Sequence, residues 1–228
     1  MGSPSRPGTY PDRLPDDVLA RRGQLPKKPD PVVLTGTQVE LRAIDFGTDL
    51  DGLHAVSSGQ PFRLGDRSHE AYDAEEVVWK WMKGRVFRDP SQLRDHLEPL
   101  ASSDDTLMMT VHHRPTGTPL GIACYMANRP ADLKIELGSI WYGLIAQGTG
   151  ASREATHLML AHAFALGYRR VEWKCDVHNE RSRRSALSYG FVFEGIQEAH
   201  MIVKGRSRDT AWFRVLVEDW PALQKRIE

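Results

Sequence analysis

The sequence predicts a mixed α/β (α+β) fold, in which helices flank a central mixed sheet of about six to seven strands. Apolar residues recur at helical spacing early in the chain and then at every second position over residues 106–126, so helices precede a hairpin. A strand-like run over residues 135–142 is followed by a glycine turn, an amphipathic helix and a second apolar run over residues 170–176. This βαβ order implies a parallel pair of strands within the sheet.

The same patterns place the elements in order along the chain. Strands are expected at residues 39–44, 106–112, 119–126, 135–142, 170–176, 195–203 and 210–217. Helices are expected at residues 49–57, 73–86, 91–101, 150–166 and 179–188. Asp73 is a plausible N-cap, Gly167 suits a helix stop, and the proline and glycine of residues 114–117 suit a hairpin turn.

Two segments of different composition divide the chain. Residues 1–31 are a proline-rich N-terminal arm with few aliphatic side chains, and residues 32–228 form one globular domain. The arm can stay disordered or drape over the domain or a neighbour, and residues 14–22 can form a helical turn or two. The arm and the terminal hairpin can also support a homodimer.

Composition narrows the class of partner. Thirty Lys and Arg residues balance thirty Asp and Glu residues, so we expect no nucleic acid and no membrane surface as partner, but a small molecule or a peptide end. No run reaches the roughly 20 apolar residues of a membrane span. Cys124 and Cys175 lie in apolar runs and are expected as reduced core thiols, which favours a cytoplasmic location.

The turn between the two parallel strands has the character of an anion site. Glycine lets the backbone adopt positive φ and approach a ligand closely, and the first N–H groups of the following helix face an anion such as a pyrophosphate. The candidate binding residues of this turn are Gln147, Gly148, Thr149, Gly150, Ala151 and Ser152.

These residues, together with four further motifs, resemble the GNAT acyltransferases, and within them the RimJ/RimL-like branch. The motifs are Glu136-Leu137-Gly138, Gln147-Gly148-Thr149-Gly150 with Glu154-Ala155, Asn179-Glu180-Arg181-Ser182, Gly190-Phe191 and the segment 200–213. The resemblance covers residues 34–221. It implies the GNAT fold, with a central parallel pair splayed to receive an acyl-CoA.

The resemblance also implies an activity, which is N-acetyl transfer from acetyl-CoA to a primary amine by direct attack in a ternary complex. The amine can belong to a small molecule or to a protein N-terminus. A non-catalytic acyl-CoA-binding or interaction module, and an acyltransferase that uses another acyl-CoA such as succinyl-CoA, remain open. Backbone groups near Trp141 and Tyr142, together with Asn179 and Ser182, are then expected to bind the pantetheine arm.

Glu136 and Ser182 are the candidate catalytic residues. The period-two rule puts Glu136, Gly138, Ile140 and Tyr142 on one face of the strand and Trp141 on the other. Glu136 could take the proton of the amine through a water, or it could be a carboxylate satisfied by its neighbours. Ser182 could donate a proton to the thiolate or position the thiol. Asn179 could contact the cofactor, cap a helix, or do both.

The chain departs from the family pattern at two positions. Ile145 stands where the family places a glutamine or arginine, which leaves the phosphates mainly to backbone N–H groups. Ala186 stands where some relatives carry a tyrosine as general acid, and Tyr189 is expected to point elsewhere on its helix. No metal site is expected, because the histidines lack suitable spacing.

Overall fold

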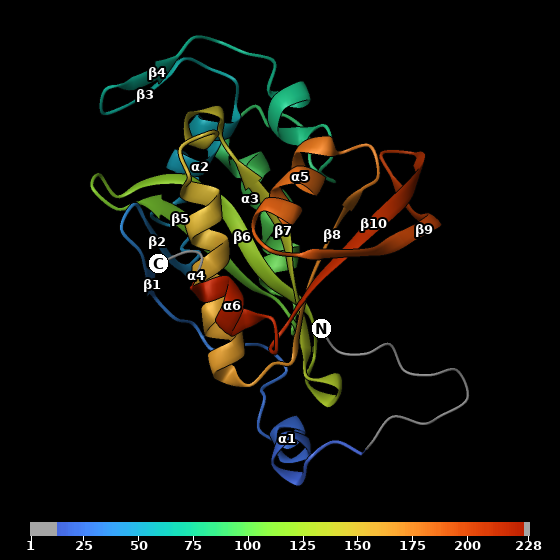
Figure 1. The fold of residues 1–228 in the computed structure, drawn as a ribbon. Coiled ribbons are helices and arrows are strands. Elements are labelled where there is room, and N and C mark those ends of the chain that lie inside the picture. The colour runs from blue at the N-terminus through green and yellow to red at the C-terminus, as the bar shows by residue number, and fades with distance from the viewer. Residues whose placement is uncertain (1–12, 226–228) are drawn as a thin grey trace.

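An eight-stranded mixed sheet forms the centre of the molecule in the computed structural model, which describes residues 13–225 (Figure 1). Its order is β1-β2-β5-β6-β7-β8-β10-β9. The bounds are β1 Leu34–Thr35, β2 Val39–Ala43, β5 Leu107–His113, β6 Thr118–Arg129, β7 Lys134–Tyr142, β8 Arg170–Asp176, β9 Val192–Val203 and β10 Arg206–Leu216. The predicted fold class is confirmed, and the strand beyond the expected number is β1, which is too short to show a period.

Helices cover both faces of this sheet. α4 packs against β2 and β7 on one face, whereas α2 and α3 pack against β5 and β6 on the other. A small separate hairpin of β3 (Phe62–Leu64) and β4 (Arg67–His69) follows α2. The helices are α1 Asp16–Ala20, α2 Leu50–Ser57, α3 Pro90–Ala101, α4 Ala151–Leu166, α5 Glu180–Ser188 and α6 Trp220–Gln224. Within residues 13–225, none of them combines the length and apolar character needed to cross a bilayer.

The predicted parallel pair is β7 and β8, and the two strands stay paired over only part of their length. Their register runs from Lys134 opposite Arg170 to Glu136 opposite Glu172. β7 continues to Tyr142 and β8 to Asp176 without further pairing between them. Because each strand otherwise pairs only on its outer side, a gap opens between them beyond Glu136, as the splayed pair requires.

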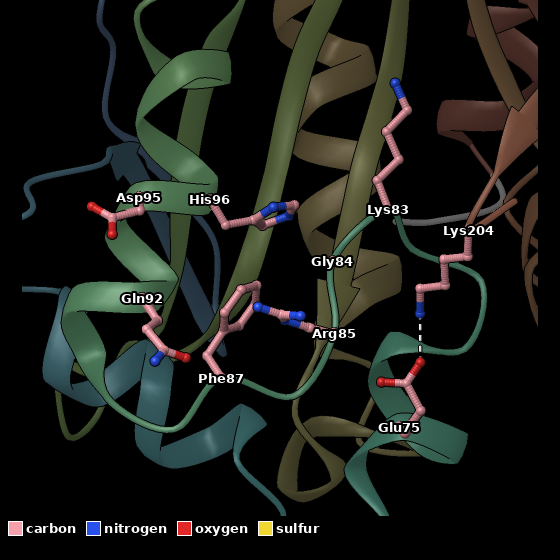
Figure 2. Close-up of a pocket in the computed structure, with 9 residues that line it drawn as sticks. All are labelled: Glu75, Lys83, Gly84, Arg85, Phe87, Gln92, Asp95, His96 and Lys204. Carbon is pink, nitrogen blue, oxygen red and sulfur yellow. Dashed lines mark hydrogen bonds and ion pairs between the residues drawn. The ribbon is translucent and has the colours of Figure 1, made fainter.

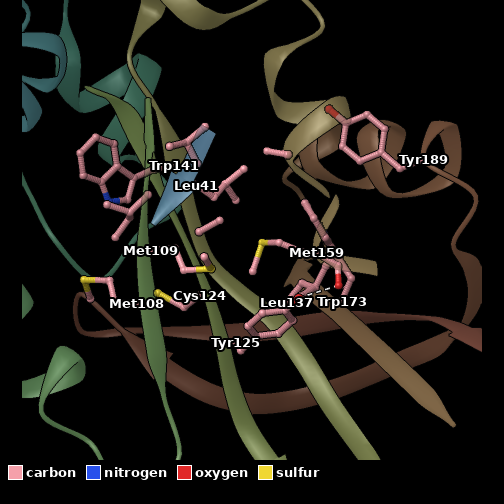
Figure 3. Packing of buried hydrophobic residues seen from close by; sticks show 14 of the residues in the cluster. Leu41, Met108, Met109, Cys124, Tyr125, Leu137, Trp141, Met159, Trp173 and Tyr189 are labelled. Atoms are coloured by element: carbon pink, nitrogen blue, oxygen red, sulfur yellow. Dashed lines mark hydrogen bonds between the residues drawn. The ribbon is translucent and has the colours of Figure 1, made fainter. Parts of the chain in front are cut away.

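A bulge in β7 overturns the predicted division of its faces. Ser139 has φ 49°, and the register against β6 shifts by one residue between Gly138 and Trp141. The shift inverts the alternation beyond the bulge, because one extra residue moves each later side chain to the opposite face. Trp141 therefore lies on the face of Glu136, opposite Leu137, as Figure 3 shows for the two labelled side chains. Tyr142 turns to the face that the period-two rule assigned to Trp141.

The predicted helix over residues 73–86 is also wrong in its extent. Only Glu75–Trp79 form a helix, a single π-turn labelled η2, although Asp73 does accept a hydrogen bond from the N–H of Glu76 as a cap would. Trp79 is buried, its Nε1 donates to the carbonyl of Ser57 at 3.0 Å, and its ring lies 5.0 Å from that of Trp141. Burial of this indole bends the chain out of the helical path, since core packing outweighs local periodicity.

The described part of the arm drapes over the domain. α1 and a following 3-10 turn, Arg21–Gly23, form the expected short helical stretch. The amide of Asn128 donates to the carbonyls of Pro26 and Lys27 at 3.0 and 2.9 Å, which ties the extended segment to the sheet. Residues 1–12 of the predicted arm lie outside the described residues.

Candidate active site

A cleft of about 860 Å³ opens where β7 and β8 have separated. Its walls are the end of β7, the loop that begins α4, helix α5 and the segment after η2. Most of the predicted binding residues meet in it, namely Trp141, Tyr142, Gln147, Gly148, Gly150, Ser152, Asn179 and Ser182. Thr149, Ala151 and Glu136 do not line it.

The glycine loop presents free backbone donors to this cleft. Gly148 and Gly150 have φ 73° and 90°, values that only glycine adopts without strain. Alternate N–H groups of the loop are already used internally: those of Gln147, Thr149 and Ala151 donate to Leu144, Ala146 and the Thr149 hydroxyl. Among the described residues, nothing accepts from the N–H groups of Gly148, Gly150 and Ser152. The donors for an anion are therefore every second N–H, together with the N-terminus of α4.

Thr149 and Ala151 thus act within the loop. The Thr149 hydroxyl donates to the carbonyl of Ala146 at 2.7 Å and accepts from the N–H of Ala151 at 3.2 Å. This pair of bonds holds the two glycines at their positive φ values. The two residues shape the cradle, and their own polar groups are not free to bind a ligand.

Arginine side chains lie near the glycine loop, although Ile145 stands where the family places a glutamine or arginine. Ile145 is buried in the core, in the 3-10 turn Leu144–Ala146 that precedes the loop. The Gln147 amide oxygen instead accepts from Arg181 at 3.3 Å, and the Arg67 guanidinium donates to the Gln147 carbonyl at 3.4 Å. Arg153 also lines the cleft. The roles of Arg67 and Arg181 could not be predicted from local patterns, because only the tertiary fold brings β4 and α5 to the loop.

Two tyrosines point into the cleft. Burial raises the pKa of Tyr142, whose hydroxyl is buried and has no hydrogen-bond partner among the described residues. The residue lines the cleft, but its hydroxyl is closed off from solvent, so a ligand reaches this donor only after neighbouring side chains move. The Tyr189 hydroxyl hydrogen-bonds to Ser152 Oγ at 2.6 Å, so it is engaged at the start of α4, in agreement with the expectation that it points away from the position of the tyrosine acid. Tyr189 is the C-cap of α5 and keeps a helical conformation, and its ring packs against His157 of α4 with centroids 6.1 Å apart.

Asn179 and Ser182 stand together at the start of α5. Asn179 Oδ1 accepts from the N–H of Ser182 at 3.1 Å, which makes Asn179 the N-cap, while its residue still borders the cleft. Trp173 Nε1 donates to Ser182 Oγ at 3.0 Å and so fixes the position of the hydroxyl. Cys175 is buried nearby, and desolvation raises the pKa of its thiol, which makes it a poor nucleophile.

Glu136 is the last residue of β7 that pairs with β8. It lies on the face of the sheet opposite Leu137 and α4. Its side chain is 3% exposed, and Oε2 lies 2.8 Å from Lys174 Nζ on β8. Burial raises the pKa of this carboxyl, and the charge of Lys174 opposes that rise. A Cβ on Gly138 would lie 2.6 Å from Glu136 Oε1, so the glycine gives the carboxylate its room. The site therefore holds a buried carboxylate beside the gap, on the side away from α4.

A second cavity of about 610 Å³ lies on this other side, between α3, residues 83–87 and the tip of the β9–β10 hairpin (Figure 2). Lys204 at the hairpin tip forms an ion pair with Glu75 and donates to the carbonyl of Trp79 at 2.8 Å. His96 and Phe87 form an aromatic wall whose rings are 5.1 Å apart. None of the predicted site residues lines this cavity. Across residues 13–225, no cluster of three or more His, Cys, Asp or Glu side chains is arranged to hold a metal ion.

The two walls of the larger cleft also meet at its mouth. Trp81 follows η2, His178 precedes α5, and their rings are stacked with centroids 6.5 Å apart at 13°. No local pattern predicts this contact, since 97 positions separate the two residues and the strands β5 to β8 lie between them. Together, the partly separated parallel strands, the glycine loop and the cleft between them define an acyltransferase of the acyl-CoA-dependent class.

Comparison with known proteins identifies the family. The model of the acetyltransferase (GNAT) domain matches residues 60–192. A GCN5-related N-acetyltransferase from Brucella melitensis is 37% identical, with a TM-score of 0.78 over 87% of this chain and 84% of the other. The chain belongs to the GNAT acetyltransferase family.

Other solved structures show the same fold at lower identity. A probable GNAT acetyltransferase from Chromobacterium violaceum is 28% identical, with a TM-score of 0.78 over 95% of this chain and all of the other. RimL, a ribosomal L7/L12 alpha-N-protein acetyltransferase, is 19% identical, with a TM-score of 0.66 over 82% of this chain and 94% of the other, which shows the fold alone. No curated protein matches the chain significantly.

Proposed function

We propose that this acetyltransferase moves the acetyl group of acetyl-CoA to a primary amine, by direct attack within a ternary complex. The observation that carries the proposal is the end of the β7–β8 pairing at Glu136 and Glu172, with free N–H donors at one end of the gap and a buried carboxylate beside it. A cofactor and an amine could then meet through the gap from opposite sides of the sheet. Backbone positions near Trp141 and Tyr142 border the cofactor side.

Each part of the chemistry has a residue in this proposal. When bound, acetyl-CoA supplies an acyl group activated as a thioester. Gly148, Gly150 and Ser152 hold its pyrophosphate through their N–H groups, and the Tyr142 hydroxyl donates to the pantetheine arm. Glu136 accepts the proton that the amine must lose, directly or through a water, because an ammonium group cannot attack.

Ser182 takes the place of the tyrosine acid in this proposal. Its Oγ accepts from Trp173 and it also hydrogen-bonds with Cys175, so the hydroxyl is held in place and would turn its proton from that sulfur toward the thiolate. Ala186, at the position of that tyrosine, is fully buried and has no acidic group, so it cannot donate a proton. The raised pKa of Cys175 supports direct transfer over an acyl-enzyme on this thiol.

Calorimetry and an acceptor screen test the proposal together. We expect acetyl-CoA to bind with micromolar affinity and succinyl-CoA to bind more weakly. In mass spectrometry, at least one amine in a broad panel should gain the mass of one acetyl group, about 42 Da. Absence of binding at millimolar acetyl-CoA would contradict the cofactor assignment. Tight binding without any acetylated amine would favour a non-catalytic module, and preference for succinyl-CoA would reassign the acyl group.

Replacement of Lys174 by methionine should change the pH dependence of the reaction. Lys174 opposes the burial that raises the pKa of Glu136, so its loss raises that pKa further. Glu136 must be deprotonated to act as a base, and the acid limb of kcat/KM should therefore move to higher pH. Activity at pH 6 should fall by on the order of tenfold and recover at alkaline pH.

Lys134→Met is the matched control for this profile. Lys134 pairs with Glu172 at 3.2 Å on the neighbouring strand, so this variant also removes a lysine from a carboxylate partner. We expect it to leave the pH profile unchanged. An unshifted profile in Lys174→Met would remove Lys174 from the positioning of Glu136, and Lys174→Arg should retain most of the wild-type behaviour.

Ser182→Ala should lower kcat by about three- to tenfold and leave the affinity for acetyl-CoA nearly unchanged. The variant removes a proton donor and leaves Trp173 Nε1 without its acceptor. Ser185→Ala, which removes a hydroxyl from the same helix and the same cleft, is the control and should keep the wild-type rate. Equal rates for both variants in a steady-state assay would exclude Ser182 as the donor.

A further inference from the structure

An arginine on β10 has no hydrogen-bond or ion-pair partner among the described residues. Arg208 is on β10, its Nε is buried, and its guanidinium makes no hydrogen bond or ion pair with any residue from 13 to 225. A buried donor that lacks an acceptor destabilises the folded protein. Such a group in a folded protein calls for an explanation, and a ligand that pairs with it is the simplest.

The register of the sheet places Arg208 at the open end of the gap. Trp212 and Thr210 on β10 lie opposite Lys174 and Asp176, which is the last residue of β8. Arg208 precedes Thr210 by two residues in β10, beyond the end of β8, and the register of β10 against β9 shifts between these two residues. It therefore stands past Lys174, in the direction in which β7 and β8 move apart.

The charges on this face are unequal. Lys174 Nζ is compensated by Glu136 and lies 5.1 Å from the centre of the Trp212 ring. His200 hydrogen-bonds through Nδ1 to the Thr210 hydroxyl at 3.0 Å, and its pKa is lowered by burial and by the cations Lys174 and Arg208, which favours the uncharged imidazole. The same charge of Arg208 acts on Glu136. Asp176 is the other acid at this end of β8, and its Oδ1 is engaged by the N–H and by the ring of His178. Arg208 therefore forms no ion pair with a described carboxylate.

The smaller cavity is also lined by more cationic than acidic side chains. Lys204, which lines it, is four residues from Arg208 on the same hairpin. Lys83 and Arg85 also line it, and neither forms an ion pair with another described residue. Asp95 is its unpaired acid, and in Figure 2 this side chain points away from the space that His96, Phe87 and Arg85 surround. The face from which an amine would approach therefore carries more positive than negative charge.

We infer that the acceptor of this enzyme carries a carboxylate close to its amine, and that Arg208 binds this carboxylate while Glu136 faces the amine. The inference rests on the proposed acetyl transfer and names the class of its acceptor. A planar guanidinium binds a carboxylate through two parallel N–H donors, which would fix the amine relative to the gap. The carboxylate can belong to a free amino acid or to an acidic residue beside the N-terminus of a peptide. A polyamine, which carries only positive charge, would be repelled.

Binding of reaction products tests this inference without turnover. In the presence of CoA, N-acetyl amino acids and their C-terminal amides are titrated against the wild-type protein and against Arg208→Met by calorimetry. We expect the acids to bind wild type about 10- to 100-fold more tightly than the amides, and Arg208→Met to lose this difference. Acetylated dipeptide amides with Asp or Asn at the second position form the arm that tests a peptide source.

Controls separate the outcomes. Arg206→Met removes an exposed arginine from the same strand and should keep the wild-type preference, and Arg208→Lys should keep part of it. Equal binding of acids and amides to wild type, or an unchanged preference in Arg208→Met, would overturn the inference. If the acids bind selectively but no amine is ever acetylated, the acidic site stands and the proposed reaction fails. If an amide or a polyamine is the better acceptor, the reaction stands and the acidic site fails.

Discussion

Glu136→Gln is expected to lower kcat by about 10²- to 10⁴-fold, the range that general-base catalysis contributes, with little change in the affinity for acetyl-CoA. The amide has nearly the shape of the carboxylate but cannot accept the proton. Glu136 does not line the cofactor cleft, so the cleft should stay intact. Steady-state kinetics and calorimetry on the same preparations measure the two quantities.

The pH dependence of the wild-type enzyme gives an independent check. Because burial raises the pKa of Glu136, the carboxyl should still be partly protonated above the pKa of an ordinary glutamate, about 4.3. The rate should therefore fall as the pH drops through this raised pKa, and it should be full above it. In Glu136→Gln this limb should disappear from the residual activity.

Glu172→Gln is the matched control for charge and position. Glu172 lies opposite Glu136 on β8, is also buried, and pairs with Lys134 and Arg170. Its loss should lower stability, because two cations lose their partner, but should leave kcat within a few fold of wild type. A wild-type rate in Glu136→Gln, or an equal loss in both variants, would mean that Glu136 is a structural carboxylate.

Gly148→Asp is expected to weaken the binding of acetyl-CoA by on the order of 100-fold or more. A carboxylate beside the cradle repels the pyrophosphate, and a side chain prevents close approach of the backbone. A Cβ at Gly148 would meet no atom within 4 Å, so the fold has room for the substitution. Calorimetry with acetyl-CoA measures the loss, and thermal unfolding reports on the fold.

Gly117→Asp separates the local strain from the effect on the ligand. Gly117 has φ 69°, against 73° for Gly148, and a Cβ there would also meet nothing within 4 Å. It lies in the turn between β5 and β6 and does not line the cleft. Both variants should lose a similar amount of stability, about 1 kcal/mol for aspartate at positive φ, but only Gly148→Asp should lose the cofactor. Unchanged affinity in Gly148→Asp would place the phosphates elsewhere.

Much of the fold could be predicted because it follows from short-range patterns. The apolar runs of β5 and β6, the proline-glycine turn between them and the apolar stripe of α4 each depend on neighbouring residues. The helix predicted over residues 73–86 failed for the opposite reason. Its apolar residues have helical spacing, but Trp79 gains more by packing on Trp141 and Phe87 than the segment gains from further helical turns.

Some residues of the candidate site could likewise be predicted from local sequence, and others could not. Gly148, Gly150 and Asn179 could be recognised because a turn or a cap depends on the residue itself and its immediate neighbours. The roles of Thr149 and Ala151 within the loop could not, since they depend on which N–H groups find internal acceptors. The period-two rule failed at Ser139, where one extra residue in β7 exchanges the faces of Trp141 and Tyr142.

The sequence by itself determined the order of the elements, the glycine cradle and the position of an acidic residue on the strand before it. Only the tertiary structure decided what surrounds that acid. Lys174 and Arg208 reach the neighbourhood of Glu136 through the pairing of β7 with β8 and of β8 with β10. Pairing between strands far apart in the chain is set by the burial of the whole sheet, which leaves no signal in the local spacing of residues.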